Sequence, residues 1–597
     1  MAKRQPWHQV TRELVDCAMG RVPADLVIRD GRWVCVQTGE IIPHTDVAVK
    51  GSRIAFVGAS AAHAVGPSTK IIDAKGRYVL PGLLDGHMHV ESGMVTVTEF
   101  VRAVAPRGTT GMFIDPHEIA NIFGLNGVWL MAAEAAQQPI NVWVQMPSCA
   151  PSAPGFENPG ATVGPDEVAE AMTWPGIIGL GEMMNFPGVF SGDAKMHDEM
   201  AETMKANKTV GGHYASPDLG LPFHGYVAGG AQDDHEGTRA EDAAARARQG
   251  MRPMLRLGSA WYDVATQVKA ITEMGMDPRR FILCTDDSHS GTLVNDGHMD
   301  RVLRHAIAQG LNPITAIQMM TINTAEHFGL SRDLGMIAPG RYADIVLSSD
   351  LANFRAELVI AAGEVIAENG KMTIELPAYD YPDHVKHSVH LARPLTAQDF
   401  GVPAPAGKTR VMANVIGVIE NQAPTRHLRL SLPVVDGAVP GDLSQDVYKI
   451  AVVERHKSTG KVQVGFVSGL NLSVPCAVAS TVAHDSHHMI VIGTDDAHMA
   501  LAANHLAQVN GGFCVARDGK IQATVELRIA GLMSDERAEV VAAKAQRLLA
   551  ELGNCGCHLN NANMQISLLA LVVIPELRIS DMGLVDVTTF QFVPVIE

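Results

Sequence analysis

The sequence lacks the features that mark membrane proteins and secreted proteins. The longest late apolar run, from Leu568 to Ile574, is far shorter than the roughly 20 residues that cross a bilayer. Two cations near the N-terminus, Lys3 and Arg4, are followed by no apolar segment, so no signal peptide is predicted. The 8 cysteines in 597 residues show no framework spacing, which is typical of free thiols in a reducing compartment. We therefore expect a cytoplasmic protein with no membrane partner.

Positive charge is also scarce. Lys and Arg total 47 against 64 Asp and Glu, which gives a formal net charge of −17. Nucleic-acid binding depends on clustered positive charge, so this balance disfavours a nucleic-acid partner. Hydrophobic residues make up 47% of the chain and charged residues 19%. This composition is too apolar for a disordered chain and typical of a globular protein with large cores.

The residue patterns divide the chain into segments of different character. Residues 1–20 carry an amphipathic helix. Short apolar alternations separated by turn pairs predict β-structure over 21–77, and a similar pattern returns over 335–375. A stretch rich in Pro and His, 376–409, is predicted to be a linker. Alternating strand and helix patterns over 410–597 predict a mixed α/β domain.

Between the two β segments, over 78–334, apolar runs alternate with segments of helical periodicity. Eight such runs over about 250 residues match the number and length expected of a (β/α)₈ barrel of the TIM type. The fifth and sixth runs give the weakest strand signal, because they are rich in Gly and polar residues. The runs are Tyr78–Leu84, Thr110–Ile114, Asn141–Val144, Gly176–Leu180, Thr209–Gly212, Tyr226–Ala231, Met251–Leu257 and Phe281–Leu283.

Residues with metal-binding side chains directly follow several of these runs. His87 and His89 follow the first run, and their spacing places both imidazoles on one face of an extended chain. The ends of the fourth, fifth, sixth and eighth runs carry four more: Glu182, His213, His235 and Asp286. The carboxyl ends of barrel strands open onto one face, so these side chains should converge there. Four histidines and two carboxylates suit a pair of borderline divalent ions.

Each of these residues, taken alone, also has a structural explanation. Asp286 could cap the helix that follows it, and an isolated histidine is often a surface or core residue. Glu182 lies among apolar residues, where an unpaired carboxylate is costly, so a charged partner or a metal is already favoured there. Independent structural roles would not place such residues after successive strands. The joint pattern therefore favours a metal centre.

Several longer motifs resemble one family. Val79-Leu-Pro-Gly-Leu-Leu-Asp-Gly-His-Met-His89 resembles the first-strand signature of the amidohydrolase superfamily, and residues 335–346 resemble the return into its composite β domain. More specific motifs resemble the bacterial adenine deaminase branch, above all Asp115-Pro-His-Glu-Ile-Ala-Asn121 and Cys284-Thr-Asp-Asp287. The resemblance implies a composite β domain from 21–77 and 335–375, beside a catalytic barrel and a C-terminal domain of the adenine deaminase type.

The resemblance also implies a reaction and a cofactor. The reaction is the hydrolysis of adenine to hypoxanthine and ammonia, with the attacking hydroxide generated at two divalent ions. Metal coordination lowers the pKa of bound water to about 7, which makes hydroxide available at neutral pH. We expect His87 and His89 to hold one ion with Asp286, and His213 and His235 to hold the other. The family favours Mn(II) or Fe(II), and Zn(II) is also compatible with these ligands.

Further roles follow from the same resemblance. Glu182 is expected to bridge the ions, in place of the carboxylated lysine that many binuclear relatives use. Asp286 is placed to accept the proton of the attacking water. The candidates for the acid that faces the purine are Glu118 and His117. The alternative for His117 and Asp115 is that they brace the metal ligands.

The substrate pocket is less sharply predicted. The candidates for contact with adenine are Asp115, Glu91, Ser92, His484 and His487. The last two belong to a C-terminal histidine cluster, which is expected either to cover the barrel mouth or a neighbouring subunit's site, or to be a polar surface loop. The resemblance further implies a homo-oligomer. Two other functions remain open: hydrolysis of another aminopurine or a cyclic amide, and a scaffold without metal, which the complete ligand set disfavours.

Overall fold

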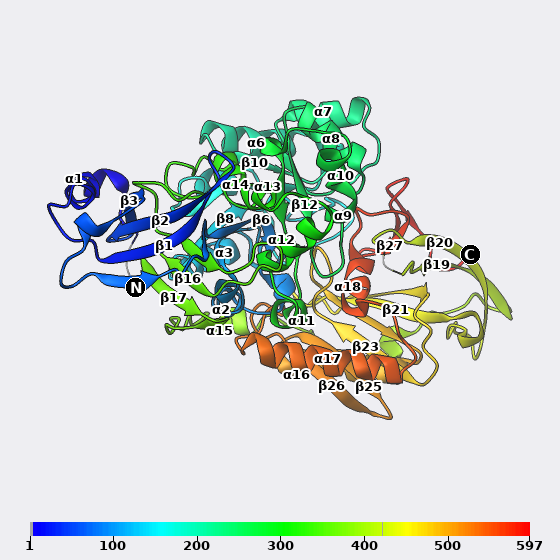
Figure 1. Cartoon of the computed structure of the whole chain (residues 1–597). Helices are drawn as coiled ribbons and strands as arrows, with labels where there is room; N and C mark the ends of the chain where they lie inside the picture. Colours follow the sequence, from blue (N-terminus) through cyan, green and yellow to red (C-terminus); the bar gives the residue numbers. More distant parts are fainter. Residues whose placement is uncertain (1–3, 421) are drawn as a thin grey trace.

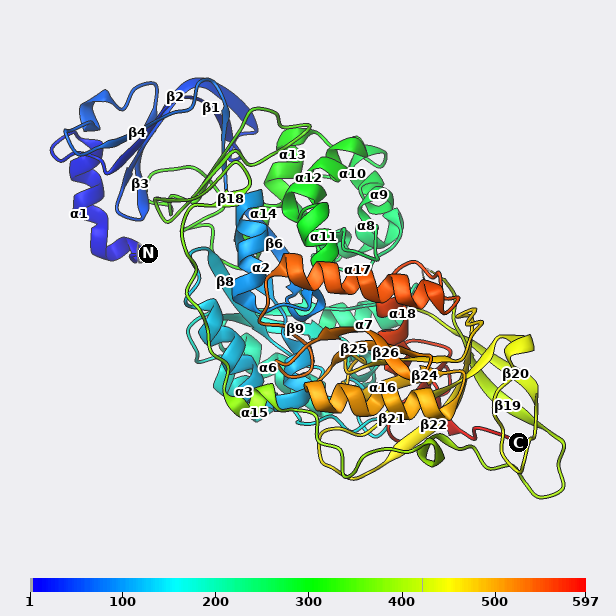
Figure 2. The same cartoon turned by 90° about the horizontal axis from the view of Figure 1, so that it is seen from below.

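The computed structural model describes residues 4–420 and 422–597. Residues 1–3 of the predicted N-terminal extension lie outside this range. A small β sheet and a C-terminal α/β domain lie at opposite ends of the molecule, with a barrel between them (Figures 1 and 2). In the part of the chain that the structure describes, none of the helices combines the length and the apolar character needed to cross a bilayer.

The small sheet combines two segments that lie far apart in the sequence. Its strand β15 pairs antiparallel with β5, and β5 pairs in turn with β1. Helix α1 (Trp7–Ala18) packs beside it through the buried Val10, Leu14 and Cys17. The strands are β1 (Leu26–Cys35), β2 (Glu40–Lys50), β3 (Arg53–Gly58), β4 (Lys70–Asp73), β5 (Tyr78–Pro81), β15 (Ile345–Ser348), β16 (Leu358–Ala361), β17 (Glu364–Glu368) and β18 (Lys371–Met372).

The centre of the molecule is a closed barrel of parallel strands, which confirms the predicted TIM-type fold. Parallel pairing runs from β6 through β10, and from β11 through β13. The N–H of Gln232 donates to the carbonyl of Val210 at 2.9 Å and joins β10 to β11, while β14 pairs with β6 and closes the ring. The strands are β6 (Leu83–His89), β7 (Thr109–Ile114), β8 (Asn141–Met146), β9 (Ile177–Met183), β10 (Thr209–Gly212), β11 (Asp233–Asp234), β12 (Arg252–Arg256) and β13 (Ile282–Cys284), which continues into β14 (Asp286–Asp287).

Two of the predicted strand runs were wrong in part. The run Tyr78–Leu84 is divided between two sheets, because β5 belongs to the small sheet and the barrel strand β6 begins at Leu83. The predicted sixth strand, Tyr226–Ala231, instead covers the end of helix α7 (Leu221–Gly229), and β11 takes its place in the barrel. Tyr226 is buried, and its hydroxyl donates to the carbonyl of Met183 at 3.0 Å. A short apolar run packs equally well as a strand or a helix, so periodicity could not decide between them.

Helices follow the barrel strands and cover the outside of the barrel. They include α2 (Val97–Val104), α3 (His117–Ala135), α4 (Pro165–Ala171), α5 (Phe186–Ser191), α6 (Ala194–Lys205), α8 (Ala240–Arg248), α9 (Val264–Gln267), α10 (Lys269–Thr272), α11 (Ser290–Asn295), α12 (Met299–Ala308), α13 (Pro313–Met319) and α14 (Ile322–His327).

The C-terminal domain is built on an eight-stranded sheet that two long helices cover. Helix α17 packs on β26 and also on α11 of the barrel, so it lies at the junction of the two domains (Figure 2). The elements are β19 (Arg410–Gly417), β20 (Arg426–Pro433), β21 (Val447–Val453), β22 (Val462–Ser468), β23 (Cys476–Ser480), β24 (Met489–Gly493), α16 (Asp496–Val509), β25 (Gly512–Arg517), β26 (Lys520–Glu526), α17 (Ala538–Asn554), α18 (Ala562–Ser567), β27 (Leu577–Ile579), β28 (Leu584–Asp586) and β29 (Gln591–Val593).

The segment predicted as a linker, 376–409, has little regular structure beyond the short helix α15 (Asp383–Lys386). It is nevertheless packed against both neighbouring domains. The hydroxyl of Tyr381 donates to Glu134 of α3 at 2.6 Å, and Phe400 lies in the core of the C-terminal domain. The C-terminal domain is therefore anchored to the barrel along this segment.

Candidate metal centre and active site

The carboxyl ends of the barrel strands bring all six predicted metal ligands together. Two of the residues lie at the end of β6, and one is the second-last residue of β9. One residue directly follows β10, another directly follows β11, and the last one is the first residue of β14. Five of the six side chains are buried, and His213 is the most exposed at 14%. The residues are His87, His89, Glu182, His213, His235 and Asp286.

Glu182 lies between the histidines. Its Oε1 atom is 3.6 Å from Nε2 of His89, while its Oε2 atom is 2.5 Å from Nδ1 of His213 and 3.1 Å from Nε2 of His235. Burial alone would raise the pKa of Glu182, but the surrounding imidazoles, His213 foremost, hold this pKa well below its usual range. The two carboxylate oxygens thus face different histidines, as a bridging ligand requires.

Asp286 faces the two histidines of β6. Its Oδ1 atom is 3.4 Å from Nε2 of His89 and 3.8 Å from Nε2 of His87. Its other oxygen accepts a hydrogen bond from Nη1 of Arg256 at 2.7 Å. The backbone of Asp286 has a φ of 60°, a left-handed conformation that costs free energy in a residue with a side chain. The surrounding structure therefore holds this carboxylate in a strained but defined position.

The buried donor atoms fit divalent ions. Nε2 of His87 is buried and has no hydrogen-bond partner in the described chain. Nδ1 of His89 donates to the carbonyl of Asp115 at 2.9 Å, which leaves Nε2 free to face the carboxylates. Ligand atoms of His87, His89 and Asp286 lie within 4.8 Å of one another, as do those of a second group in which His87 joins Glu182 and His235. Imidazole and carboxylate groups at this spacing are suitable for two ions.

The predicted residues Asp115 and His117 lie next to Glu182 and not in the pocket described below. Oδ2 of Asp115 accepts the backbone N–H of Glu182 at 2.7 Å, and burial raises the pKa of Asp115 to about 7. Nδ1 of His117 lies 3.3 Å from Oε1 of Glu182. The geometry favours the bracing alternative for Asp115, while a substrate contact by Asp115 and an acid role for His117 stay predictions.

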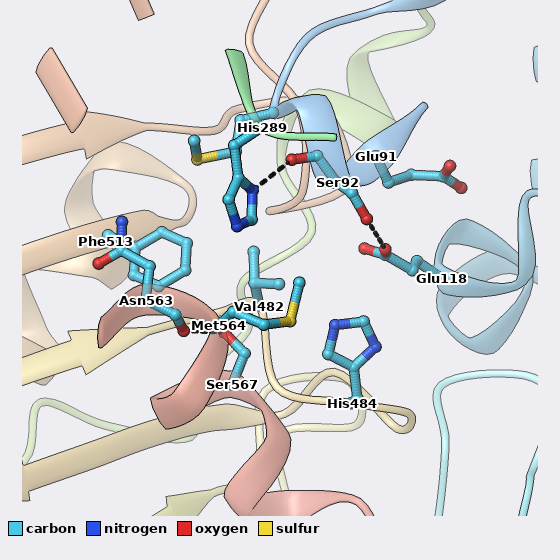
Figure 3. Close-up of a pocket in the computed structure, with 11 residues that line it drawn as sticks. Glu91, Ser92, Glu118, His289, Val482, His484, Phe513, Asn563, Met564 and Ser567 are labelled. Carbon is cyan, nitrogen blue, oxygen red and sulfur yellow. Dashed lines mark hydrogen bonds between the residues drawn. The ribbon is translucent and has the colours of Figure 1, made fainter. Parts of the chain in front are cut away.

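A small cavity opens between the barrel and the C-terminal domain, and residues of both line it. Figure 3 shows its barrel residues on one side and its C-terminal residues on the other. The barrel contributes Glu91, Ser92, Glu118 and His289; the C-terminal domain contributes His484, Phe513, Asn563 and Met564, among others.

Two carboxylates of this cavity are placed to carry protons. Ser92 donates from its hydroxyl to Oε1 of Glu118 at 3.4 Å and also contacts Asp287. Burial raises the pKa of Glu118 to about 7 and, together with the neighbouring Glu118, raises the pKa of Glu91 to about 8. Both groups are thus partly protonated near neutral pH.

The C-terminal histidine cluster is not the polar surface loop that the sequence left open. His484, His487 and His488 are all buried at the junction of the two domains. His484 lines the cavity, whereas Nδ1 of His487 accepts the backbone N–H of Ala483 at 3.3 Å. A cover over the barrel mouth therefore fits His484, and a substrate contact by His487 stays a prediction.

Sequence reasoning missed several residues of the site. Arg256, which holds Asp286, is a charged residue inside the apolar run Met251–Leu257, and this interruption was a usable signal. Asp485 lies within the predicted C-terminal histidine cluster but was not itself a candidate, and Asn563 gave no comparable signal. They reach the site only because the C-terminal domain folds over the barrel mouth.

Two family models match separate parts of the chain. The Amidohydrolase family matches residues 78–366, and the Adenine deaminase C-terminal domain matches residues 422–591. The chain is 64% identical over 589 residues to an adenine deaminase of Mesorhizobium japonicum, covering 99% of this chain and 97% of that protein. It is 63% identical over 592 residues to adenine deaminase 3 of Rhizobium meliloti, covering 99% of each. Among solved structures, a β-aspartyl dipeptidase of Fervidobacterium islandicum has 16% identity and a TM-score of 0.45, covering 59% of this chain and 98% of that chain. At this identity over nearly its whole length, the chain belongs to the adenine deaminase family.

Proposed function

We propose that this chain catalyses the hydrolysis of adenine to hypoxanthine and ammonia at a centre of two divalent metal ions. The observation that carries the proposal is the position of Glu182, whose two oxygens face separate histidines at the carboxyl ends of the barrel strands. Family membership supplies the substrate, because a fold alone does not fix one.

The proposed ligand set follows the geometry of the strand ends. His87, His89 and Asp286 would hold one ion, His213 and His235 the other, and Glu182 would contact both. When bound, the ions lower the pKa of water and so make hydroxide available near neutral pH. Imidazole and carboxylate ligands without thiolate suit Mn(II), Fe(II) or Zn(II), and the family resemblance favours the first two.

We propose that two carboxylates of the chain transfer the protons of the reaction. Asp286 turns one oxygen toward His87 and His89, and Arg256 holds the other, so Asp286 is oriented to take the proton of the attacking water. Glu118 lines the cavity and His117 does not, which favours Glu118 as the acid that protonates ring nitrogen 1 of the purine. The proton on Asp286 can then pass to the amino group, which leaves as ammonia as its bond to carbon 6 breaks. The second proton of the attacking water returns to Glu118, and carbon 6 keeps the oxygen as the carbonyl of hypoxanthine.

We propose that helix α18 recognises the edge of the purine ring by hydrogen bonding. Asn563 lines the cavity, and its Oδ1 atom is buried without a hydrogen-bond partner in the described chain. An amide in this state can pair with a ring N–H or an exocyclic amino group of a purine. Met564 and Phe513 line the same cavity and offer apolar surface to the ring faces.

We also propose a cytoplasmic location for the enzyme. All 8 cysteines are free and buried, which supports a cytoplasmic location. A homo-oligomer stays a prediction.

The decisive experiment follows adenine conversion by ultraviolet absorbance. Protein loaded with Mn(II) or Fe(II) is expected to convert adenine to hypoxanthine with release of ammonia, and chelated protein is expected to be inactive. Guanine and dihydropyrimidines serve as the alternative substrates. Turnover of either one in preference to adenine would reject the substrate proposed here.

A further inference from the structure

A second cluster of metal-binding side chains lies at the junction of the barrel and the C-terminal domain. It consists of His117, the first residue of α3, and of His484 and Asp485 in the loop between β23 and β24. One ligand atom from each residue lies within 4.8 Å of the other two, and all three residues are buried. None of them belongs to the six ligands proposed above.

The separations in this cluster suit the ligands of one ion. Oδ1 of Asp485 lies 3.8 Å from Nε2 of His117 and 3.4 Å from Nδ1 of His484. Two ligands that each lie about 2.1 Å from a tetrahedral ion are about 3.4 Å apart. The same two separations, 3.8 and 3.4 Å, relate Asp286 to its two histidines in the candidate metal centre.

Asp485 is a buried carboxylate of the junction, and neither of its oxygens has a hydrogen-bond partner in the described chain. Its exposed fraction is 0%. Among the described residues, its only partners within 4 Å that can carry positive charge are the two histidines of the cluster. An ionised carboxylate in this position is costly without a cation, and a bound metal ion would remove that cost.

His117 presents its two nitrogens to different neighbours. Nδ1 lies 3.3 Å from Oε1 of Glu182, while Nε2 faces Asp485. Metal-binding histidines commonly direct the second ring nitrogen toward a carboxylate, which fixes the tautomer and leaves the first nitrogen free as a ligand. Glu182 can play this part for His117.

The loop that carries His484 and Asp485 is held before any ion binds. The backbone N–H of His484 donates to the carbonyl of Ser567 at 3.1 Å. Nε of the fully buried Arg455 donates to the carbonyl of His487 at 2.7 Å. Rigid support of this kind is what a metal site needs from its surroundings.

We propose that His117, His484 and Asp485 form a third cation site, which binds Zn²⁺ or a similar borderline divalent ion and ties the C-terminal domain to the barrel. Two imidazoles and a carboxylate suit such an ion, and three protein ligands leave one tetrahedral position open for water. Ligands from α3 and from the β23–β24 loop make the ion a direct link between the two domains.

The test counts ions in the full-length protein. After saturation with Zn²⁺ and dialysis into metal-free buffer, the wild-type chain is expected to retain three ions by mass spectrometry. Asp485→Asn and His484→Phe are each expected to retain two. His488→Gln is the matched control from the same loop and should retain three, because Nε2 of His488 faces the carbonyl of Asn158 at 2.8 Å and Asp581 at 3.8 Å, neither of which belongs to the cluster. Anomalous diffraction at the zinc edge should place the third ion between His117 and Asp485.

Three results would each overturn the proposal: a wild-type chain that saturates at two ions, a third ion that persists in either folded variant, or a third ion that diffracts from another position. Circular dichroism checks that each variant folds, and if one misfolds, the other variant and the wild-type crystal still decide. Adenine turnover by wild-type protein loaded with Mn(II) or Fe(II) separates this inference from the proposed function. Three retained zinc ions together with no conversion of adenine by the Mn(II)- or Fe(II)-loaded protein would contradict only the proposed function. Conversion of adenine by a chain that retains only two zinc ions would contradict only the third site.

Discussion

Glu182 is the residue on which the candidate metal centre depends most. Replacing it with Gln keeps its size but removes the charge shared between His89 on one side and His213 and His235 on the other. We expect Glu182→Gln to lower kcat/KM for adenine by more than about 100-fold and to reduce the retained metal. Activity and metal content are measured on one preparation, with the exposed Glu170→Gln as control. Normal activity with a full metal complement would exclude the bridging role.

Glu157 is a buried carboxylate whose charge opposes folding. Its Oε1 atom accepts hydrogen bonds from Ser152 and Ala153, but Oε2 has no partner in the described chain, and burial raises its pKa to about 7. The folded state therefore holds this proton more tightly than the unfolded state, whose pKa is about 4.5. The resulting stability is complete below pH 4.5 and is lost as the pH rises through 7.

The variant Glu157→Gln tests whether the charge on Glu157 lowers the stability of the folded state as the pH rises. An amide stays neutral at every pH, so the free energy of unfolding of the variant should rise relative to wild type by about 1 to 3 kcal/mol between pH 5 and pH 8. Urea unfolding at the two pH values provides the measurement, and Glu170→Gln should show no such difference. An equal effect of Glu157→Gln at both pH values would contradict the assigned pKa.

At the scale of elements, α18 is a short helix with a large predicted effect on substrate binding. It supplies Asn563 and Met564 to a cavity whose other wall belongs to the barrel. Asn563→Ala should lower kcat/KM for adenine about tenfold, because one hydrogen bond to the purine is lost, and should leave the metal content unchanged. The control is Asn554→Ala at the exposed end of α17. Unchanged kinetics of Asn563→Ala would remove α18 from the purine site.

Helix α7 shows why element type was harder to predict than element position. Its apolar residues Tyr226 and Val227 pack in the core around the barrel, and in the sequence alone they resemble a short buried strand. The true sixth strand, β11, is only two residues long and contains no apolar residue. Its place in the barrel is set by pairing with β12 and by the contact of Gln232 with β10. Such pairing depends on neighbours that periodicity within one segment does not record.

At the scale of the whole molecule, the proposed ligands come from strands around the full circumference of the barrel. Each of the two ions would take ligands from more than one strand, so it binds the folded state and not the unfolded chain, and at 100 times its dissociation constant it would add about 2.7 kcal/mol of stability. Mn(II) should therefore raise the unfolding temperature of chelated protein in calorimetry. Ca²⁺, which prefers oxygen ligands, should not. An unfolding temperature that does not respond to Mn(II) would contradict a centre that links the strands.

The sequence by itself determined the parts of this protein that depend on local chemistry. Short apolar runs defined most barrel strands, and the side chain that follows each strand fell at the same face because parallel strands share their carboxyl ends. All six proposed ligands were found in this way, and the motifs around Asp115 and Cys284 indicated the family. These features need only one strand and its next few residues to be recognised.

Only the tertiary structure decided which groups complete the site. Arg256 reaches Asp286 across 30 positions, and Asn563 and Asp485 arrive from a domain whose sheet begins at β19, far from the barrel strands along the chain. The burial of the C-terminal histidines was set in the same way, by the packing of this domain over the barrel mouth. Contacts between distant segments depend on how whole domains pack, and the free energy of that packing is spread over many residues, so no short stretch of sequence records it.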